Sequence, residues 1–189
     1  DLALYAIHTN LDNVIEGVNG KIADKLGLIN RRVLAPKANL LHKLSVFVPV
    51  SHHDAVLNAL FDAGAGSIGK YDECSFNSGG SGTYKAGEGA QPFLGTIGVR
   101  HREDEVKVEV IFPAWLQGAI LKSLRAAHPY EEIAFDIYPL LNTADNTGAG
   151  LVGDLPNEMT EVECLNYIKN KFNLQVIRHT PFLHKKVKK

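Results

Sequence analysis

The sequence predicts an α+β fold built around an antiparallel sheet. In three segments between about residues 41 and 140, apolar residues alternate with other residues, as in strands with one buried face. In two further segments apolar residues recur every three or four positions, as on one face of a helix. The order is strand, helix, a glycine-rich region with one or two strands, strand, helix and strand. This order predicts a ferredoxin-like sandwich with two helices on one face of the sheet.

The clearest elements of this central region are expected at five places. Residues 42–50 and 106–112 show the alternation of strands, and residues 133–138 show it again after Pro129. A helix over residues 116–127 ends before that proline. The other helix follows the first strand and carries its apolar stripe at Val56, Ala59, Leu60 and Ala63.

Between these patterns, residues 64–98 are rich in glycine. We expect residues 71–76 and 82–85 to pair as a hairpin across residues 77–80, because Asn-Ser-Gly-Gly is typical of tight turns. Residues 96–101 are a candidate for a further strand. Long glycine-rich loops often carry function, which draws attention to this region.

The first segment outside the central region indicates part of an α/β body. Residues 2–7 are nearly all apolar, which favours a strand buried on both faces. A helix is expected between Ile15 and Leu26, and residues 32–34 are a candidate short strand.

The last segment begins with residues 142–150, which have the composition of a linker. Residues 150–155 and 174–177 are candidate strands. Between them Thr160 and Glu163 have the spacing of a capping box, which predicts the start of a helix.

The composition is that of an ordinary globular protein, with 45% hydrophobic residues, 22% charged residues and a net charge of −1. No global field therefore favours nucleic acid or an anionic membrane. We find no apolar run long enough to cross a bilayer and no signal-peptide pattern. Two cysteines are too few for a disulfide framework, so we expect a cytoplasmic protein. Because the only methionine is Met159, we also expect an internal fragment.

Residues 64–71 nearly match a phosphate-binding loop. Tyr71, however, stands where the motif needs serine or threonine, and the segment follows a helix instead of a strand. A helix end and a turn are therefore favoured. His52 and His53 are neighbours in the first turn of a helix and point in different directions, so a surface pair is favoured over a metal chelate.

His128, Glu131 and Glu132 form another candidate group. If the strand after Pro129 has begun at this point, the two carboxylates face opposite sides and cannot join one site. A structural or interface role is therefore favoured over catalysis. Cys74 and Cys164 lie far apart in the chain and are expected to be core or surface thiols.

His8 and Asp12 follow the first expected strand, a position where α/β folds commonly bind ligands. Carboxylate oxygens and imidazole nitrogens are common metal ligands. An aspartate at the end of a strand is as often the N-cap of a helix. The residues alone leave both interpretations open.

Several separated motifs occur in the order known from one protein family. Residues 5–12, Tyr-Ala-Ile-His-Thr-Asn-Leu-Asp, resemble a signature of the NIF-three-like family, whose members are often called GTP cyclohydrolase 1 type 2 homologues. Residues 60–66, 87–95 and 128–132 resemble a domain inserted in its longer bacterial members. Residues 148–155 resemble the start of the family's second half, so the resemblance covers nearly the whole chain.

The resemblance implies a two-lobed α/β body, a dinuclear site for divalent metal ions (zinc, iron or manganese) and assembly into a hexamer. Of the family's metal ligands only one maps here, onto Asp12, and His8 would support the site instead of binding metal. The implied domains are the end of the first lobe in residues 1–40, an inserted ferredoxin-like domain of PII or CutA type in 41–141, and the start of the second lobe in 142–189.

Two functions follow from this resemblance. The intact protein would be a metal-dependent hydrolase of the GTP cyclohydrolase type. One carboxylate cannot hold two metals, so the present chain is expected to be poor in metal and inactive. Alternatively, residues 41–140 form a non-enzymatic module that binds a small ligand or other copies of itself. Neither function predicts a nucleic-acid or membrane partner.

Overall fold

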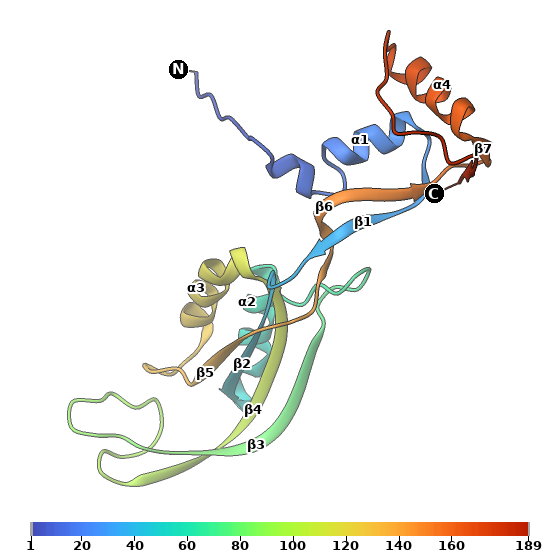
Figure 1. Ribbon diagram of the computed structural model, residues 1–189. Coiled ribbons are helices and arrows are strands. Elements are labelled where there is room, and N and C mark those ends of the chain that lie inside the picture. The colour runs from blue at the N-terminus through green and yellow to red at the C-terminus, as the bar shows by residue number, and fades with distance from the viewer. Residues whose placement is uncertain (1, 189) are drawn as a thin grey trace. The chain divides into compact units, whose positions relative to one another are not determined.

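The computed structural model describes residues 2–188, and the chain divides into two compact units. One unit is Ala38–Asn142, and the other combines Asp1–Lys37 with Thr143–Lys189. Both contain helices and antiparallel strands (Figure 1), so the expected α+β class is confirmed. Within residues 2–188 no helix is both long enough and apolar enough to span a membrane.

The unit Ala38–Asn142 contains a four-stranded antiparallel sheet. Its order is β3-β4-β2-β5. The strands are β2 (Leu41–Pro49), β3 (Ser75–Lys85), β4 (Arg100–Pro113) and β5 (Phe135–Pro139). The helices are α2 (His53–Asp62) and α3 (Gln117–Ala127), each preceded by a short 3-10 turn, η2 (Val50–His52) and η3 (Ala114–Leu116).

The core of this unit lies between the two helices and one face of the sheet. Leu44 pairs with Val110 and Val46 with Val108, so apolar side chains from neighbouring strands share that face. The helices supply the second layer. The core residues that are at most 1% exposed include Leu44, Val46, Val48, Val56, Leu60, Val108, Val110, Phe112, Ile120 and Leu124. The five clearest predicted elements of the central region, three strands and two helices, are confirmed.

The expected hairpin across residues 77–80 is wrong. Strand β3 runs without a turn through the whole glycine-rich stretch and pairs with β4 from Ser75↔Val110 to Lys85↔Arg100. The reason is the length of β4, whose 14 residues extend beyond the 9 residues of β2 and offer β3 a partner throughout. The chain turns back only after Lys85, and residues 96–99 belong to that connection, not to a strand.

The other unit is built on one antiparallel pair, β1 (Ile29–Lys37) with β6 (Ala144–Asp154). Most of the expected linker over residues 142–150 is therefore strand. Gly148, which pairs with Pro36, allows the two strands to lie this close, because a Cβ at this position would be 2.2 Å from the Ala35 carbonyl oxygen. The remaining elements are η1 (Asn10–Asn13), α1 (Val18–Lys25), α4 (Glu161–Phe172) and the short pair β7 (Met159–Thr160) with β8 (Lys186–Val187).

Two further expectations for this unit are wrong. Residues 2–7 form no strand, and Leu2 and Leu4 are 95% and 94% exposed, because no described strand lies beside them. Residues 174–177 are also irregular.

The expected helix between Ile15 and Leu26 is present as α1, and the candidate strands at residues 32–34 and 150–155 lie in β1 and, as far as Asp154, in β6. The capping box is present: the Glu163 backbone N–H donates to the Thr160 hydroxyl at 3.3 Å, and the Thr160 N–H donates to the Glu163 carboxylate at 2.7 Å.

Candidate functional site

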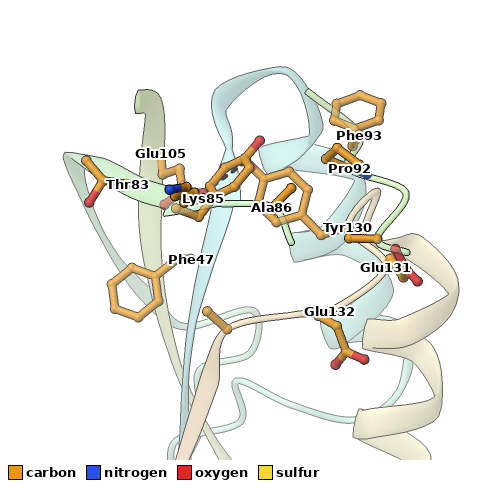
Figure 2. Close-up of a pocket in the computed structure, with 14 residues that line it drawn as sticks. Phe47, Thr83, Lys85, Ala86, Pro92, Phe93, Glu105, Tyr130, Glu131 and Glu132 are labelled. Atoms are coloured by element: carbon orange, nitrogen blue, oxygen red, sulfur yellow. Dashed lines mark hydrogen bonds between the residues drawn. The ribbon is translucent and has the colours of Figure 1, made fainter. Parts of the chain in front are cut away.

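A pocket of about 440 Å³ lies at one end of the sheet in the unit Ala38–Asn142. The end of β2, the end of β3 and the start of β4 meet there, since these strands are antiparallel. Residues 86–99 and residues 128–134 complete its walls (Figure 2). Its size is in the range of pockets that bind small molecules.

One wall of the pocket comes from the part of the β3–β4 ribbon that extends beyond β2. The last residue of β2, Pro49, pairs with Glu105, whereas β3 and β4 stay paired as far as Lys85 and Arg100. We call the extending residues 81–85 and 100–104 the overhang. The Tyr84 hydroxyl in the overhang donates to the Leu94 carbonyl oxygen at 2.7 Å, which fastens the 86–99 connection to the wall.

The buried acidic group of the pocket is Glu105. It is 9% exposed, and its Oε1 accepts a hydrogen bond from the Tyr130 hydroxyl at 3.0 Å. Its Oε2 lies over the backbone of Gly82, where an added Cβ would be only 2.0 Å from it. No donor from residues 2–188 bonds Oε2. The structure therefore holds a carboxylate in the pocket wall with one oxygen unused.

The position of Gly82 gives a specific prediction. In Gly82→Ala the new methyl group displaces the Glu105 carboxylate, and Tyr130 loses its acceptor. The flexible carboxylate can swing away, so the change itself costs little stability. Removing the hydroxyl with Tyr130→Phe should then cost about 1.5–3 kcal/mol in the wild type but almost nothing in Gly82→Ala.

Urea denaturation of the four proteins of this double-mutant cycle measures the coupling. Gly80→Ala is the matched control, because an added Cβ at Gly80 meets no atom within 4 Å. Equal costs of Tyr130→Phe in the wild-type and Gly82→Ala backgrounds would contradict the assigned role of Gly82.

His128 positions Tyr130 from the next segment. Its ring is buried at 6% exposure; Nε2 lies 3.0 Å from the Phe47 carbonyl oxygen, and Nδ1 accepts from the Tyr130 backbone N–H at 3.1 Å. Only the neutral ring with its proton on Nε2 satisfies both partners. Burial lowers the pKa of His128, and the charge of His52 lowers it further, against the opposing effect of the hydrogen bond to Phe47.

A pH dependence of stability follows. Because the pKa of His128 is lowered from its usual 6.5 in the folded state, the unfolded chain binds more protons there at mildly acid pH. Its contribution to the free energy of unfolding is complete above pH 6.5 and is lost as the pH falls below that value. Urea denaturation between pH 5 and pH 8 should show this slope, and His128→Gln should reduce it. His8→Gln, at an exposed position, should leave the slope unchanged.

Aromatic rings form much of the remaining surface. The Tyr130 ring lies 5.9 Å from Tyr84 and 6.2 Å from Phe93, centroid to centroid. Figure 2 places Phe47 on the opposite side of the pocket from Tyr130 and Phe93. Burial raises the pKa of Tyr130, and the hydrogen bond to Glu105 adds to this rise, so the hydroxyl remains a donor.

Glu131 and Glu132 both line this pocket, contrary to the expectation that they could not share a site. The expectation placed them in a strand, but β5 begins only at Phe135, and the preceding irregular backbone does not alternate its side chains. Figure 2 shows the two carboxylates on the same side of the pocket. The Glu131 carboxylate accepts the backbone N–H of Gln91 at 2.8 Å.

Asp12 lies in the other unit, in η1. Its backbone N–H donates to the Thr9 carbonyl oxygen at 3.1 Å, and its carbonyl oxygen accepts from the Asn19 side chain at 2.7 Å. The neighbouring Ile15 N–H donates to Asn146 of β6 at 3.2 Å. The backbone of Asp12 is thus held in place by its neighbours. In the described part of the chain no three His, Cys, Asp or Glu residues form a group able to hold a metal ion.

The remaining candidates take structural positions. Helix α2 ends before Gly64, whose φ is 96°. The segment after it makes an isolated bridge between Ile68 and Tyr71 and does not lead into a helix, so no helix N-terminus faces a phosphate there.

His52 and His53 are half-buried, which differs from the expected surface pair. The centroid of the His52 ring lies 5.3 Å from that of Phe93. Both cysteines, Cys74 and Cys164, are half-buried free thiols.

Comparison with known proteins identifies the family. The model of the Duf34/NIF3 (NGG1p interacting factor 3) family matches residues 1–189. The chain belongs to the Duf34/NIF3 family. A Bacillus subtilis (strain 168) protein named GTP cyclohydrolase 1 type 2 homolog is 43% identical over 179 residues, which cover 94% of this chain and 48% of that protein. A Mycobacterium leprae (strain TN) protein of the same name is 42% identical over 156 residues, 82% of this chain and 40% of that protein.

Solved structures share this fold. A Bacillus cereus protein related to NIF3 is 43% identical and superposes with a TM-score of 0.83, over 97% of this chain and 49% of that chain. A Staphylococcus aureus protein is 25% identical with a TM-score of 0.61, over 97% of this chain and 46% of its own. The present Duf34/NIF3 chain thus spans about half the length of the relatives it matches.

Proposed function

We propose that the unit Ala38–Asn142 is a ferredoxin-like, ligand-sensing domain inserted in a Duf34/NIF3 protein. Its elements follow one another as strand, helix, strand, strand, helix and strand, and its sheet order is β3-β4-β2-β5. The observation that carries the proposal is the pocket of about 440 Å³, because it combines an apolar aromatic surface with a few inward polar groups.

A fragment screen on the whole 189-residue chain tests this function. Small aromatic fragments of different charge are titrated while backbone amide shifts are recorded by NMR. We expect hits whose shifts map to the pocket wall, around Phe47, Tyr84 and Tyr130. Ala134→Trp places an indole in the pocket while its carbonyl oxygen still accepts the Phe47 N–H, and it should abolish these hits. Leu141→Trp, outside the pocket, is the control. Hits that persist in Ala134→Trp would contradict the proposal.

We further propose that Asp12 supplies one ligand of a dinuclear divalent-metal site in the longer protein, with hydrolase activity of the kind that the relatives' names indicate. Zinc, iron or manganese would suit such a site. The fixed backbone of Asp12 supports this role. The described residues alone offer no complete ligand set, so the other ligands would come from the remaining length of the longer protein. Hexameric assembly and a cytoplasmic location are part of the same proposal.

Replacing Asp12 tests the metal site. In the longer protein Asp12→Ala should remove most of the bound metal, as measured by elemental analysis of the purified protein, because a site that loses a charged ligand binds a hard cation far more weakly. Glu16→Ala, an exposed carboxylate four residues away, should keep full occupancy. Unchanged metal content in Asp12→Ala would remove Asp12 from the ligand set.

A further inference from the structure

We propose that the pocket of the unit Ala38–Asn142 selects an organic cation, namely a protonated amine or amidine on a flat apolar body. This inference rests on the proposed function, since it assumes that the pocket is a ligand site. It adds the chemical class of the ligand. Three features of the pocket lead to it: its charge, its unused hydrogen-bond acceptor and its aromatic surface.

The charged side chains of the pocket favour a cation. Glu105, Glu131 and Glu132 all line it, and the only cationic lining residue among those described is Lys85. Lys85 is exposed, and within the described residues no ion pair joins its ammonium group to an acidic side chain. Three carboxylates against one ammonium group leave the pocket lining with a net negative charge.

The unused acceptor is Oε2 of Glu105. Glu105 as a residue is 9% exposed, and the Tyr130 hydroxyl satisfies Oε1 only. Oε2 has no donor among the described residues, and a carboxylate oxygen binds a charged N–H donor more strongly than a neutral one. The pocket is thus prepared for a ligand that brings both a positive charge and an N–H group.

The aromatic surface suits the rest of such a ligand. Phe47, Tyr84, Phe93 and Tyr130 all line the pocket, and aromatic faces attract cations through their quadrupoles. The Tyr130 hydroxyl donates a hydrogen bond to Glu105, so the polar end of this side chain is already paired and its ring contributes apolar surface to the pocket. An anionic ligand would meet three carboxylates, and a neutral ligand would gain less from Glu105.

Three probes of equal shape test the charge preference. Benzamidine is a cation, benzamide is neutral and benzoate is an anion. Each is titrated into the whole 189-residue chain at neutral pH while amide shifts around Tyr84, Glu105 and Tyr130 are followed by NMR. We expect benzamidine to bind at least about tenfold more tightly than the other two, which corresponds to about 1.4 kcal/mol.

Two charge-matched variants locate the effect. Glu105→Gln should weaken benzamidine binding about tenfold and leave benzamide nearly unchanged. Glu88→Gln removes the same charge from the 86–99 connection, outside the pocket lining, and should bind benzamidine like the wild type. Equal binding of all three probes, or tighter binding of benzoate, would overturn the cation preference and leave the ligand site standing. No binding of benzamidine to the wild type would overturn this inference, while the fragment screen judges the ligand site separately.

Discussion

Phe112→Ala is expected to lower the free energy of unfolding of the unit Ala38–Asn142 by about 3–5 kcal/mol, the usual cost of removing a buried aromatic ring. Phe112 is 1% exposed and lies in the core between the sheet and the helices. Its ring also packs edge-on against His42 at 5.8 Å, so the change removes a specific contact together with buried area. Urea denaturation, followed by far-UV circular dichroism, measures the loss.

Phe76→Ala is the matched control for this prediction. Phe76 lies on β3 of the same sheet but is 67% exposed, so its loss should change the free energy of unfolding by less than about 0.5 kcal/mol. Similar costs at the two positions would mean that the core does not lie between the helices and the sheet as described.

Gly148→Ala should destabilise the β1–β6 pair by about 1–3 kcal/mol, the usual cost of forcing extra atoms into a packed site. A Cβ added at Gly148 would lie 2.2 Å from the Ala35 carbonyl oxygen and 2.8 Å from the Pro36 Cα. Both are backbone atoms, so the strands must separate to make room. The Asp12 segment should loosen as well, because Ile15 and Asn146 join it to β6 next to this point.

Hydrogen exchange reports this effect residue by residue. In Gly148→Ala the amides of β1 and β6 and the Ile15 amide should exchange faster, while the amides of β2 and β4 keep their rates. Gly79→Ala, in an open part of β3, should change none of these rates, since an added Cβ there meets no atom within 4 Å. Normal protection of β6 in Gly148→Ala would show that the strands accommodate the methyl group.

The strands and helices with strong periodicity were predictable, because each buries one face against a core formed within the same unit. Leu44, Val46 and Val48 show this for β2. The start of α4 was predictable for a different reason, because the capping box of Thr160 and Glu163 is formed by residues three positions apart. Both kinds of signal depend on few distant residues.

The errors occurred where distant partners decide the local structure. The Asn-Ser-Gly-Gly sequence is typical of a turn, but β4 continues beside it and the ladder holds it extended. The composition of residues 142–150 is typical of a linker, but β1 lies alongside. Residues 2–7 have the composition of a buried strand and lack a described neighbour to pair with. In each case the local composition favoured one structure, and the presence or absence of a neighbouring strand decided the other.

Most residues of the candidate pocket could not be predicted from the sequence. Glu105 alternates with apolar residues and so has the pattern of a solvent-exposed strand position, and Phe47 and Tyr84 have no motif around them. The resemblance marked residues 128–132, which do supply His128 and Tyr130, but it did not indicate their partners. Only the register of β3, β4 and β2 brings these side chains together.

The overhang gives this fold a way to change the shape of its pocket without changing its core. None of residues 81–85 and 100–104 belongs to the buried core, yet residues 82–85 line the pocket and are held in place by their pairing with β4. Removing two residues from each strand would shorten that wall and preserve the inward and outward direction of every remaining side chain. Pocket depth can therefore evolve by paired insertions and deletions in a two-stranded ribbon, while the buried core that stabilises the unit is unchanged.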